Sequence, residues 1–194
     1  EVYREYVYDG EKQVSMLEFP EIAEHSIIID SESKRYSMCG VRIGCLVTRS
    51  KTLHDAAMKF AQARLSPVLI GQILATAAHD NDAEYIQSVR EEYTKRRNLL
   101  VELLNEIPGV KCPTPKGAFY CVAELPVEDA DDFAQWLLEH FSDNGETVMV
   151  APASGFYSVP ELGKKQVRIA YVLKEEDLRR SVELIKIALE QYKK

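Results

Sequence analysis

The spacing of apolar residues in the first quarter of the chain predicts two short strands around a polar loop. The run Ile-Ile-Ile at residues 27–29, closed by Asp30, is typical of a short buried strand. Residues 43–48 are apolar again and predict a second strand. The loop between them carries serines, a lysine, arginines and glycines. Because open α/β sheets bind ligands where strands end, this loop is the first candidate site.

A helical spacing of apolar residues begins at Lys51. It predicts one helix up to about residue 64, then a second helix that Pro67 opens and that ends near residues 79–82. A third helix is expected over residues 83–105, where the apolar residues stay on or near one face. Its length would allow it to join two domains, and an Ile-Pro-Gly sequence ends it.

The remainder of the chain alternates strands with helices. The expected elements are a loop at 113–117, a strand at 118–123, an amphipathic helix at 129–141, a short strand at 147–150, a long loop at 151–163, a strand at 166–173 and a closing helix at 175–192. This alternation indicates an α/β or α+β chain. The change from strand-like to helical spacing predicts a division of the chain into two units. The division lies near the helix that begins at residue 51, and the second unit starts at about residue 64.

Composition and charge narrow the class of protein. The chain has 194 residues, of which 46% are apolar, enough for one domain or a domain and a half. Lys and Arg number 24 against 31 Asp and Glu, so the net charge of −7 argues against a nucleic-acid partner. No apolar run reaches the roughly 18 residues of a membrane span, and residues 1–5 lack the features of a signal peptide. We therefore expect a cytoplasmic protein that acts on small molecules, without a nucleic-acid or membrane partner.

The four cysteines show neither a metal-binding nor a disulfide pattern. No C-x-x-C pair occurs, and no histidine stands at a matching spacing. We therefore expect no bound metal and reduced thiols. The cysteines are Cys39, Cys45, Cys112 and Cys121.

The polar loop combines groups that suit one kind of ligand. Lys34 follows the first strand, with Ser31 and Ser33 beside it and Arg42 in a glycine-bounded turn further on. A primary amine can bind a carbonyl as an imine, and a guanidinium with hydroxyls can hold a phosphate. Pyridoxal phosphate needs both. The ordinary alternative is a solvated lysine, an exposed ion pair and two serines that cap the loop.

The residues of this loop also resemble a known family signature. The string Ser31-x-Ser33-Lys34-x-Tyr36-x-Met38-x-Gly40-x-Arg42-x-Gly44 is similar to the cofactor-lysine motif of class I pyridoxal-phosphate aminotransferases, the aspartate aminotransferase superfamily of fold type I. Further matching segments follow in the family's order: Glu1-Val2-Tyr3, Tyr8-Asp9-Gly10, Lys116-Gly117-Ala118-Phe119-Tyr120, Ala151-Pro152-Ala153-Ser154-Gly155-Phe156 and Val167-Arg168-Ile169-Ala170-Tyr171. The resemblance covers essentially the whole chain and corresponds to the C-terminal half of a family member.

The resemblance implies a fold and a domain division. Residues 1–55 would end the large cofactor-binding domain of an α/β fold type I enzyme. Residues 56–194 would supply connecting helices and the small α+β C-terminal domain. The chain starts abruptly on strand-like residues, so we expect it to be a piece of a longer protein.

The resemblance also implies roles toward the cofactor. Lys34 would form the covalent aldimine with pyridoxal 5'-phosphate and later shuttle the proton at the substrate's α-carbon. Arg42 would hold the phosphate, with the hydroxyls of Ser31 and Ser33 as further donors. Tyr3 matches the tyrosine whose phenol bonds the cofactor's ring oxygen. Without the family, Tyr3 would be a half-buried packing residue.

Other residues are implied to face the substrate. Arg168 matches the arginine that grips the α-carboxylate, and a planar guanidinium on a rigid strand can orient the Cα–H bond for cleavage. Without the family, Arg168 would be an edge-strand salt bridge. The loop at residues 152–155 would cover the substrate or be an ordinary surface loop. Arg64 lies in a segment that in the family points toward the neighbouring subunit's active site.

Two departures from the family pattern stand out. Glu32 occupies a position that is usually apolar or aromatic, so it either points to solvent or marks a local difference. The family's aspartate, three residues before the tyrosine matched by Tyr3, would fall before the first residue. We therefore expect this piece alone to have little activity and weak cofactor affinity.

The resemblance implies that the full-length protein transfers an amino group between an amino acid, aspartate or a similar one, and a 2-oxo acid. It also implies that the full-length protein is a homodimer. Two alternatives stay open. A lyase that uses the same cofactor shares the lysine loop, because reaction choice depends on groups outside it. The chain could also belong to a binding or assembly module that has lost catalysis.

Overall fold

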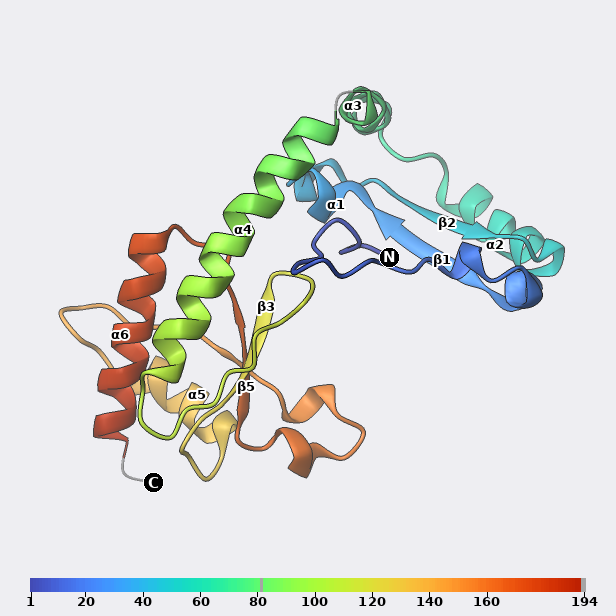
Figure 1. Cartoon of the computed structure of the whole chain (residues 1–194). Helices are drawn as coiled ribbons and strands as arrows, with labels where there is room; N and C mark the ends of the chain where they lie inside the picture. Colours follow the sequence, from blue (N-terminus) through green and yellow to red (C-terminus); the bar gives the residue numbers. More distant parts are fainter. Residues whose placement is uncertain (81, 193–194) are drawn as a thin grey trace. The chain divides into compact units, whose positions relative to one another are not determined.

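The computed structural model describes all residues except Asn81, which falls in the turn expected before the long helix, and the last two (Figure 1). The chain forms two compact units, Glu1–Arg90 and Glu91–Lys194. The division between them falls within the long helix. The boundary at residues 55–56 that the resemblance implies refers to domains of a longer protein, and it stays a prediction.

The first unit contains the two expected strands and the loop between them. Strands β1 (Ile27–Ser31) and β2 (Gly44–Thr48) form an antiparallel pair, which confirms both expected strands. The loop that joins them folds into a one-turn helix, α1 (Glu32–Arg35), and a 3-10 turn, η3 (Cys39–Val41). Two further 3-10 turns precede β1: η1 (Met16–Glu18) and η2 (Pro20–His25).

Strand β1 has one buried face and one exposed face. Ile28 and Asp30 are 5% and 7% exposed, whereas Ile27 and Ile29 are 44% and 55% exposed. Successive strand residues point to opposite faces, and an apolar run does not reveal whether both faces are covered. The expectation of a buried strand is therefore wrong for the face of β1 that carries Ile27 and Ile29.

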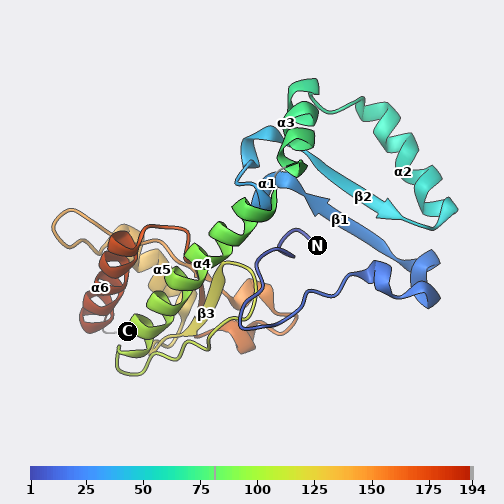
Figure 2. The ribbon, with the colours of Figure 1, turned by 45° about the horizontal axis from the view of Figure 1, so that its top comes forward.

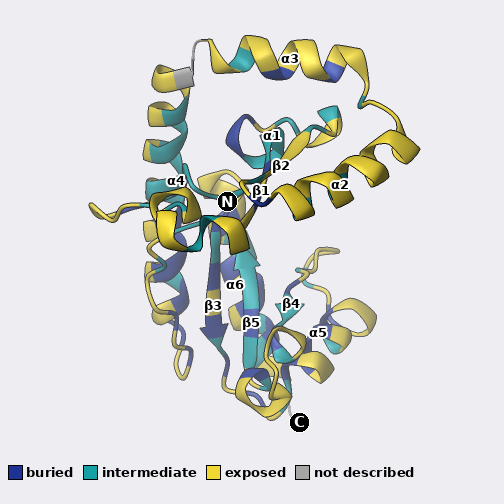
Figure 3. Ribbon diagram, turned by 90° about the vertical axis from the view of Figure 1, so that its right-hand side faces the viewer, coloured by how far each residue is buried: buried dark blue, intermediate teal, exposed yellow. Residues whose placement is uncertain are grey.

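Three helices follow the sheet of the first unit. They are α2 (Lys51–Arg64), α3 (Leu69–His79) and α4 (Asp82–Asn105), and they confirm the three expected helices. Pro67 lies two residues before α3 rather than in its first turn, because Val68 is the N-cap. Most residues of α2 and α3 are exposed (Figure 3).

Helix α3 packs closely on the last residue of η3 and on Ile43, which follows it. A Cβ atom added at Gly71 would lie 2.9 Å from the carbonyl oxygen of Val41 and 3.1 Å from the Ile43 side chain. A residue larger than glycine would therefore push the helix away from the candidate loop. This contact holds the C-terminal half of that loop against a helix of the same unit.

The second unit is built on a three-stranded antiparallel sheet. Its order is β3 (Tyr120–Glu124), β5 (Gln166–Ala170) and β4 (Ala151–Pro152). The expected strand at residues 147–150 is wrong, because the chain pairs with β5 only at the two residues of β4. Strand β3 begins later than expected, since Ala118 has a left-handed backbone with φ of 58°.

Two helices and the end of α4 complete the core of the second unit. Helix α5 (Ala130–Glu139) begins at the Asp129 N-cap, and α6 (Glu175–Gln191) runs beside the C-terminal part of α4 (Figures 1 and 2). Fully buried side chains of this unit, from these helices, from β5 and from the segments next to the strands, include Leu100, Leu104, Leu125, Phe133, Leu137, Val167, Tyr171, Leu178 and Ile185. None of the helices in the described part of the chain combines the length and apolar character that a membrane span requires.

Candidate active site

Ser31 and Ser33 shape the turn that carries Lys34. Ser31 ends β1 and is the N-cap of α1, where its hydroxyl accepts a hydrogen bond from the Ser33 backbone N–H at 3.1 Å. The Ser31 Oγ atom also lies 2.9 Å from Ser33 Oγ and 3.2 Å from the Ile43 carbonyl oxygen. The structure thus shows the capping alternative for Ser31. A phosphate-binding role for the two hydroxyls stays a prediction.

Lys34 lies half-buried in α1, and its backbone is fixed by the N-terminal segment. The Tyr6 hydroxyl donates to the Lys34 carbonyl oxygen at 2.6 Å, and Tyr6 is only 2% exposed. Tyr3 begins the turn that places Tyr6, because the Tyr3 carbonyl accepts from the Tyr6 N–H at 2.9 Å. Sequence reasoning selected Tyr3 and missed Tyr6. Nothing in the local sequence indicated that the Tyr6 hydroxyl would reach α1, which lies 28 residues further along the chain.

An ion cluster that the sequence did not reveal lies under α1. Arg35 Nη2 lies 2.8 Å from Asp30 Oδ2, and their side chains are 4% and 8% exposed. Arg35 Nε lies 3.2 Å from Glu5 Oε1, and Arg4 Nη2 lies 3.5 Å from Asp30 Oδ2. Burial alone would raise the pKa of Asp30, but the Ser31 N–H and the two arginines lower it below its usual value. Asp30 is therefore held as a carboxylate.

Glu32 belongs to the same cluster and does not point to solvent. Its side chain is 13% exposed, with Oε2 at 3.8 Å from Arg35 Nη1 and Oε1 at 3.2 Å from His79 Nε2. His79 Nδ1 lies 3.1 Å from the Tyr36 hydroxyl, and the two rings meet edge to face at 5.3 Å. The solvent-facing alternative for Glu32 is wrong. Glu32 and His79 instead dock α3 onto the lysine turn, and whether this position differs locally from the family stays a prediction.

Arg42 lies at the far end of the loop. Its backbone is left-handed, with φ of 60° and ψ of 40°, and the residue is exposed. One guanidinium N–H donates to the Cys39 carbonyl at 2.7 Å, so the side chain folds back over η3. This contact orients a planar group with five donors, which is the geometry that suits a phosphate. Arg64, the other arginine considered, lies at the exposed C-terminal end of α2.

Arg168 lies in the second unit, on the middle strand of its sheet. Its guanidinium carbon is 4.5 Å from the centre of the Tyr120 ring and 4.7 Å from that of Phe156. The alternative of an edge-strand salt bridge is wrong, because β5 has a neighbour on each side. Phe156 comes from the 3-10 turn Ser154–Phe156 after β4. A covering role for the 152–155 loop stays a prediction.

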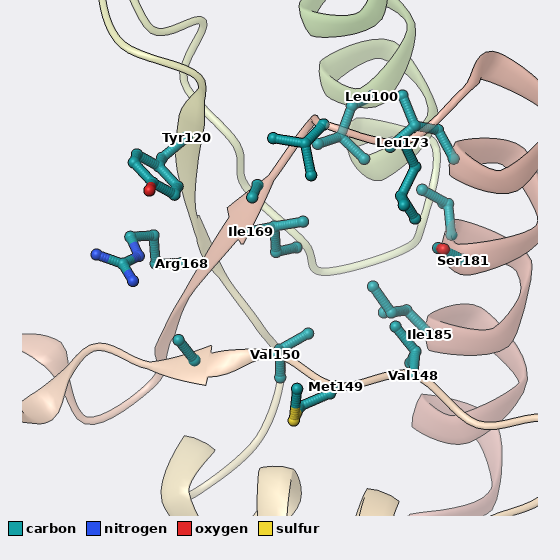
Figure 4. Close-up of a pocket in the computed structure, with 15 residues that line it drawn as sticks. Leu100, Tyr120, Val148, Met149, Val150, Arg168, Ile169, Leu173, Ser181 and Ile185 are labelled. Atoms are coloured by element: carbon teal, nitrogen blue, oxygen red, sulfur yellow. The ribbon is translucent and has the colours of Figure 1, made fainter. Parts of the chain in front are cut away.

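A cavity of about 500 Å³ adjoins Arg168 in this unit. Figure 4 shows Arg168 and Tyr120 on one side of β5, with Ile169 and Leu100 on the other. Its walls are mainly apolar and include Leu173 and Ile185. The guanidinium therefore lies at a sheet face, outside the apolar space behind the strand.

Comparison with known proteins shows the family. A family model described as aminotransferase class I and II matches residues 1–185. This chain belongs to that family. Its fold is that of the aspartate aminotransferases, which confirms the expected α/β fold type I architecture.

Three relatives illustrate the range of this family. An aspartate aminotransferase of Bacillus subtilis is 32% identical over 99% of this chain and 48% of its own length. A (5-formylfuran-3-yl)methyl phosphate transaminase of Methanocaldococcus jannaschii is 32% identical over 96% of this chain and 48% of its own. The structure of an aromatic aminotransferase from Pyrococcus horikoshii superposes with a TM-score of 0.85, at 26% identity over 98% of this chain and 50% of that one. The chain thus spans about half the length of the curated relatives it matches.

The residues of the lysine loop fit pyridoxal phosphate by the chemistry of their donors. The Lys34 amine, the exposed Arg42 guanidinium and the Ser31 and Ser33 hydroxyls lie between the last residue of β1 and the start of β2. A metal is not needed to explain these groups. Within the described residues, no three His, Cys, Asp or Glu side chains gather closely enough to hold a metal ion.

Proposed function

We propose that the full-length protein is a pyridoxal-phosphate-dependent aminotransferase that moves an amino group between an amino acid, aspartate or a similar one, and a 2-oxo acid. The observation that carries the proposal is the lysine loop of an aminotransferase-family chain. Lys34, Arg42 and Ser33 lie on this loop, directly after Ser31 at the end of β1, and the buried Arg35–Asp30 ion pair fixes the lysine turn.

The lysine loop would bind the cofactor and move a proton. Arg42 holds the phosphate through paired N–H donors, helped by Ser31 and Ser33. When bound, the cofactor withdraws electrons from the bond that breaks at the substrate's α-carbon. The Lys34 amine takes and returns the proton at that carbon. Tyr3 would donate to the ring oxygen of the cofactor.

Arg168 would bind the substrate's α-carboxylate. The rings of Tyr120 and Phe156 lie against the Arg168 guanidinium. The N–H donors at the edge of the guanidinium can then bind the carboxylate. Two parallel hydrogen bonds to a carboxylate fix the substrate's orientation, which a single-point ammonium would not do.

We also propose that the full-length protein is a cytoplasmic homodimer and that the 194-residue chain alone has low activity.

The reaction can be tested on the full-length protein by following nitrogen. With aspartate and 2-oxoglutarate, we expect glutamate to form only when both substrates and the cofactor are present. A lyase would instead release ammonia and a 2-oxo acid without any 2-oxo-acid acceptor. Absence of both reactions across the common amino acids would favour a module without catalysis and would contradict the proposal.

A further inference from the structure

Tyr6 is hydrogen-bonded to two residues that the proposed function places against the cofactor. Its backbone N–H donates to the Tyr3 carbonyl oxygen at 2.9 Å, and its hydroxyl donates to the Lys34 carbonyl oxygen at 2.6 Å. Tyr6 and Lys34 are 28 residues apart in the chain, so only the fold brings them together. One residue therefore links Tyr3 to the lysine turn.

The Tyr6 hydroxyl is not needed to form the helical turn α1 itself. The Lys34 carbonyl oxygen also accepts from the Ser37 N–H at 3.5 Å, and Ser31 caps the start of the turn. These bonds are local, and they remain when the Tyr6 hydroxyl is removed. The bond from Tyr6 comes in addition to them, so its effect is to place the turn.

Burial and a second contact make this placement specific. Tyr6 is 2% exposed, so water has little access to the bond that its hydroxyl makes. Next to it, Glu5 Oε1 lies 3.2 Å from Arg35 Nε, and the Arg35 side chain is 4% exposed. Residues 5 and 6 thus hold residues 34 and 35 at two adjacent points. Two contacts fix the orientation of the lysine turn as well as its distance.

We propose that Tyr6 is a positioning residue for the amino transfer, an inference that rests on the proposed function. Its hydroxyl is bonded to the backbone of Lys34, so Tyr6 acts through that lysine. It holds the Lys34 backbone at a fixed distance from Tyr3, so that the lysine amine and the Tyr3 phenol reach the same cofactor. Proton transfer depends steeply on placement, and a shift of about 1 Å can lower a rate by about 100-fold.

The first measurement needs neither cofactor nor substrate. In the full-length protein, Tyr6→Phe keeps the ring and removes only the hydroxyl. Hydrogen exchange of peptides covering residues 32–37 should become about fivefold faster, the factor expected for one lost hydrogen bond. Tyr171→Phe is the matched control, because Tyr171 is also buried and its hydroxyl donates to the Ala118 carbonyl oxygen at 3.0 Å. It should leave the exchange of these peptides unchanged.

The second measurement separates positioning from a general loss of structure. With pyridoxal phosphate, aspartate and 2-oxoglutarate, Tyr6→Phe should lower kcat about tenfold or more. Both KM values should change by less than about twofold, because binding of the carboxylate is left to Arg168. Tyr171→Phe should keep kcat within about twofold of the parent protein, since its hydroxyl bond lies outside the lysine turn.

Unchanged exchange of residues 32–37 in Tyr6→Phe overturns the proposal. Faster exchange with an unchanged kcat also overturns it, because the contact would then be structural only. The same holds for equal losses of kcat in Tyr6→Phe and Tyr171→Phe, provided that circular dichroism shows both variants folded. If the parent protein transfers no amino group, the proposed function fails, and the exchange measurement alone decides whether Tyr6 fixes the lysine turn.

Discussion

Arg35 Nη2 lies 2.8 Å from Asp30 Oδ2, and both side chains are almost fully buried on either side of the turn that carries Lys34. Asp30 ends the buried face of β1, and Arg35 is the last residue of α1. The ion pair therefore ties the strand to the far end of the lysine turn. A charge removed from such a pair leaves its partner buried and uncompensated, which is costly.

Substitution Arg35→Met should loosen the lysine turn. We expect a loss of about 3 kcal/mol in the stability of the first unit, the size typical of breaking a buried pair. Hydrogen exchange of peptides covering residues 27–48 measures it, because these peptides report on the first unit alone. Arg49→Met, at an exposed position, is the matched control and should change exchange by less than about 0.5 kcal/mol. Equal effects of the two variants would contradict the structural role of Arg35.

Acidification should destabilise the first unit through Asp30. Its pKa in the folded state is lower than the value of about 3.9 in an unfolded chain, so the unfolded state takes up the proton first. The stabilisation is complete above about pH 5 and is lost as the pH falls through the folded-state pKa. Exchange of the same peptides, corrected for the intrinsic rate at each pH, should show this loss.

The variant Asp30→Asn tests the origin of that pH dependence. It should already be less stable at pH 7, since Arg35 loses its charged partner, and it should show a flatter profile below pH 5. Glu24→Gln, at an exposed position, should keep the slope of the parent protein. An unchanged slope in Asp30→Asn would assign the acid sensitivity to another group.

Gly163 supports the turn that places Phe156 against Arg168. A Cβ atom there would lie 2.5 Å from the Ala153 carbonyl oxygen and 2.6 Å from Tyr157 Cδ2. Gly163→Ala should destabilise the second unit by about 2 kcal/mol, because backbone must shift. Gly155→Ala, with nothing within 4 Å of its Cβ position, is the control from the same segment. Urea unfolding followed by the fluorescence of Trp136, the single tryptophan, distinguishes them.

Arg168→Lys should weaken substrate binding in the full-length protein. A lysine keeps the charge but loses the paired donors, so KM should rise about tenfold to 100-fold for both the amino acid and the 2-oxo acid. Exposed Arg179→Lys is the control and should leave KM unchanged. A KM that stays constant in Arg168→Lys would remove Arg168 from the carboxylate site while leaving the proposed reaction intact.

The sequence was sufficient for the elements that have a strong local signal. The helical period of α2, α3 and α4 and the apolar runs of β1 and β2 predicted them correctly, and the lysine loop was found by residue type. The two-residue strand β4 was misplaced, because such a short strand exists only through pairing with β5. The contacts of Glu32 could not be predicted from the sequence, because tertiary packing brings its partners to it. One of them, His79, is 47 residues away in the chain.

Trapping the cofactor on Lys34 tests the proposed cofactor chemistry most directly. The full-length protein is incubated with pyridoxal phosphate, reduced with borohydride and digested, and the modified peptides are identified by mass spectrometry. We expect a pyridoxyl group on Lys34 that disappears in Lys34→Ala and persists in Lys51→Ala, because Lys51 is an exposed residue of α2. Equal labelling of Lys34→Ala and the parent protein, or labels spread evenly over surface lysines, would contradict it.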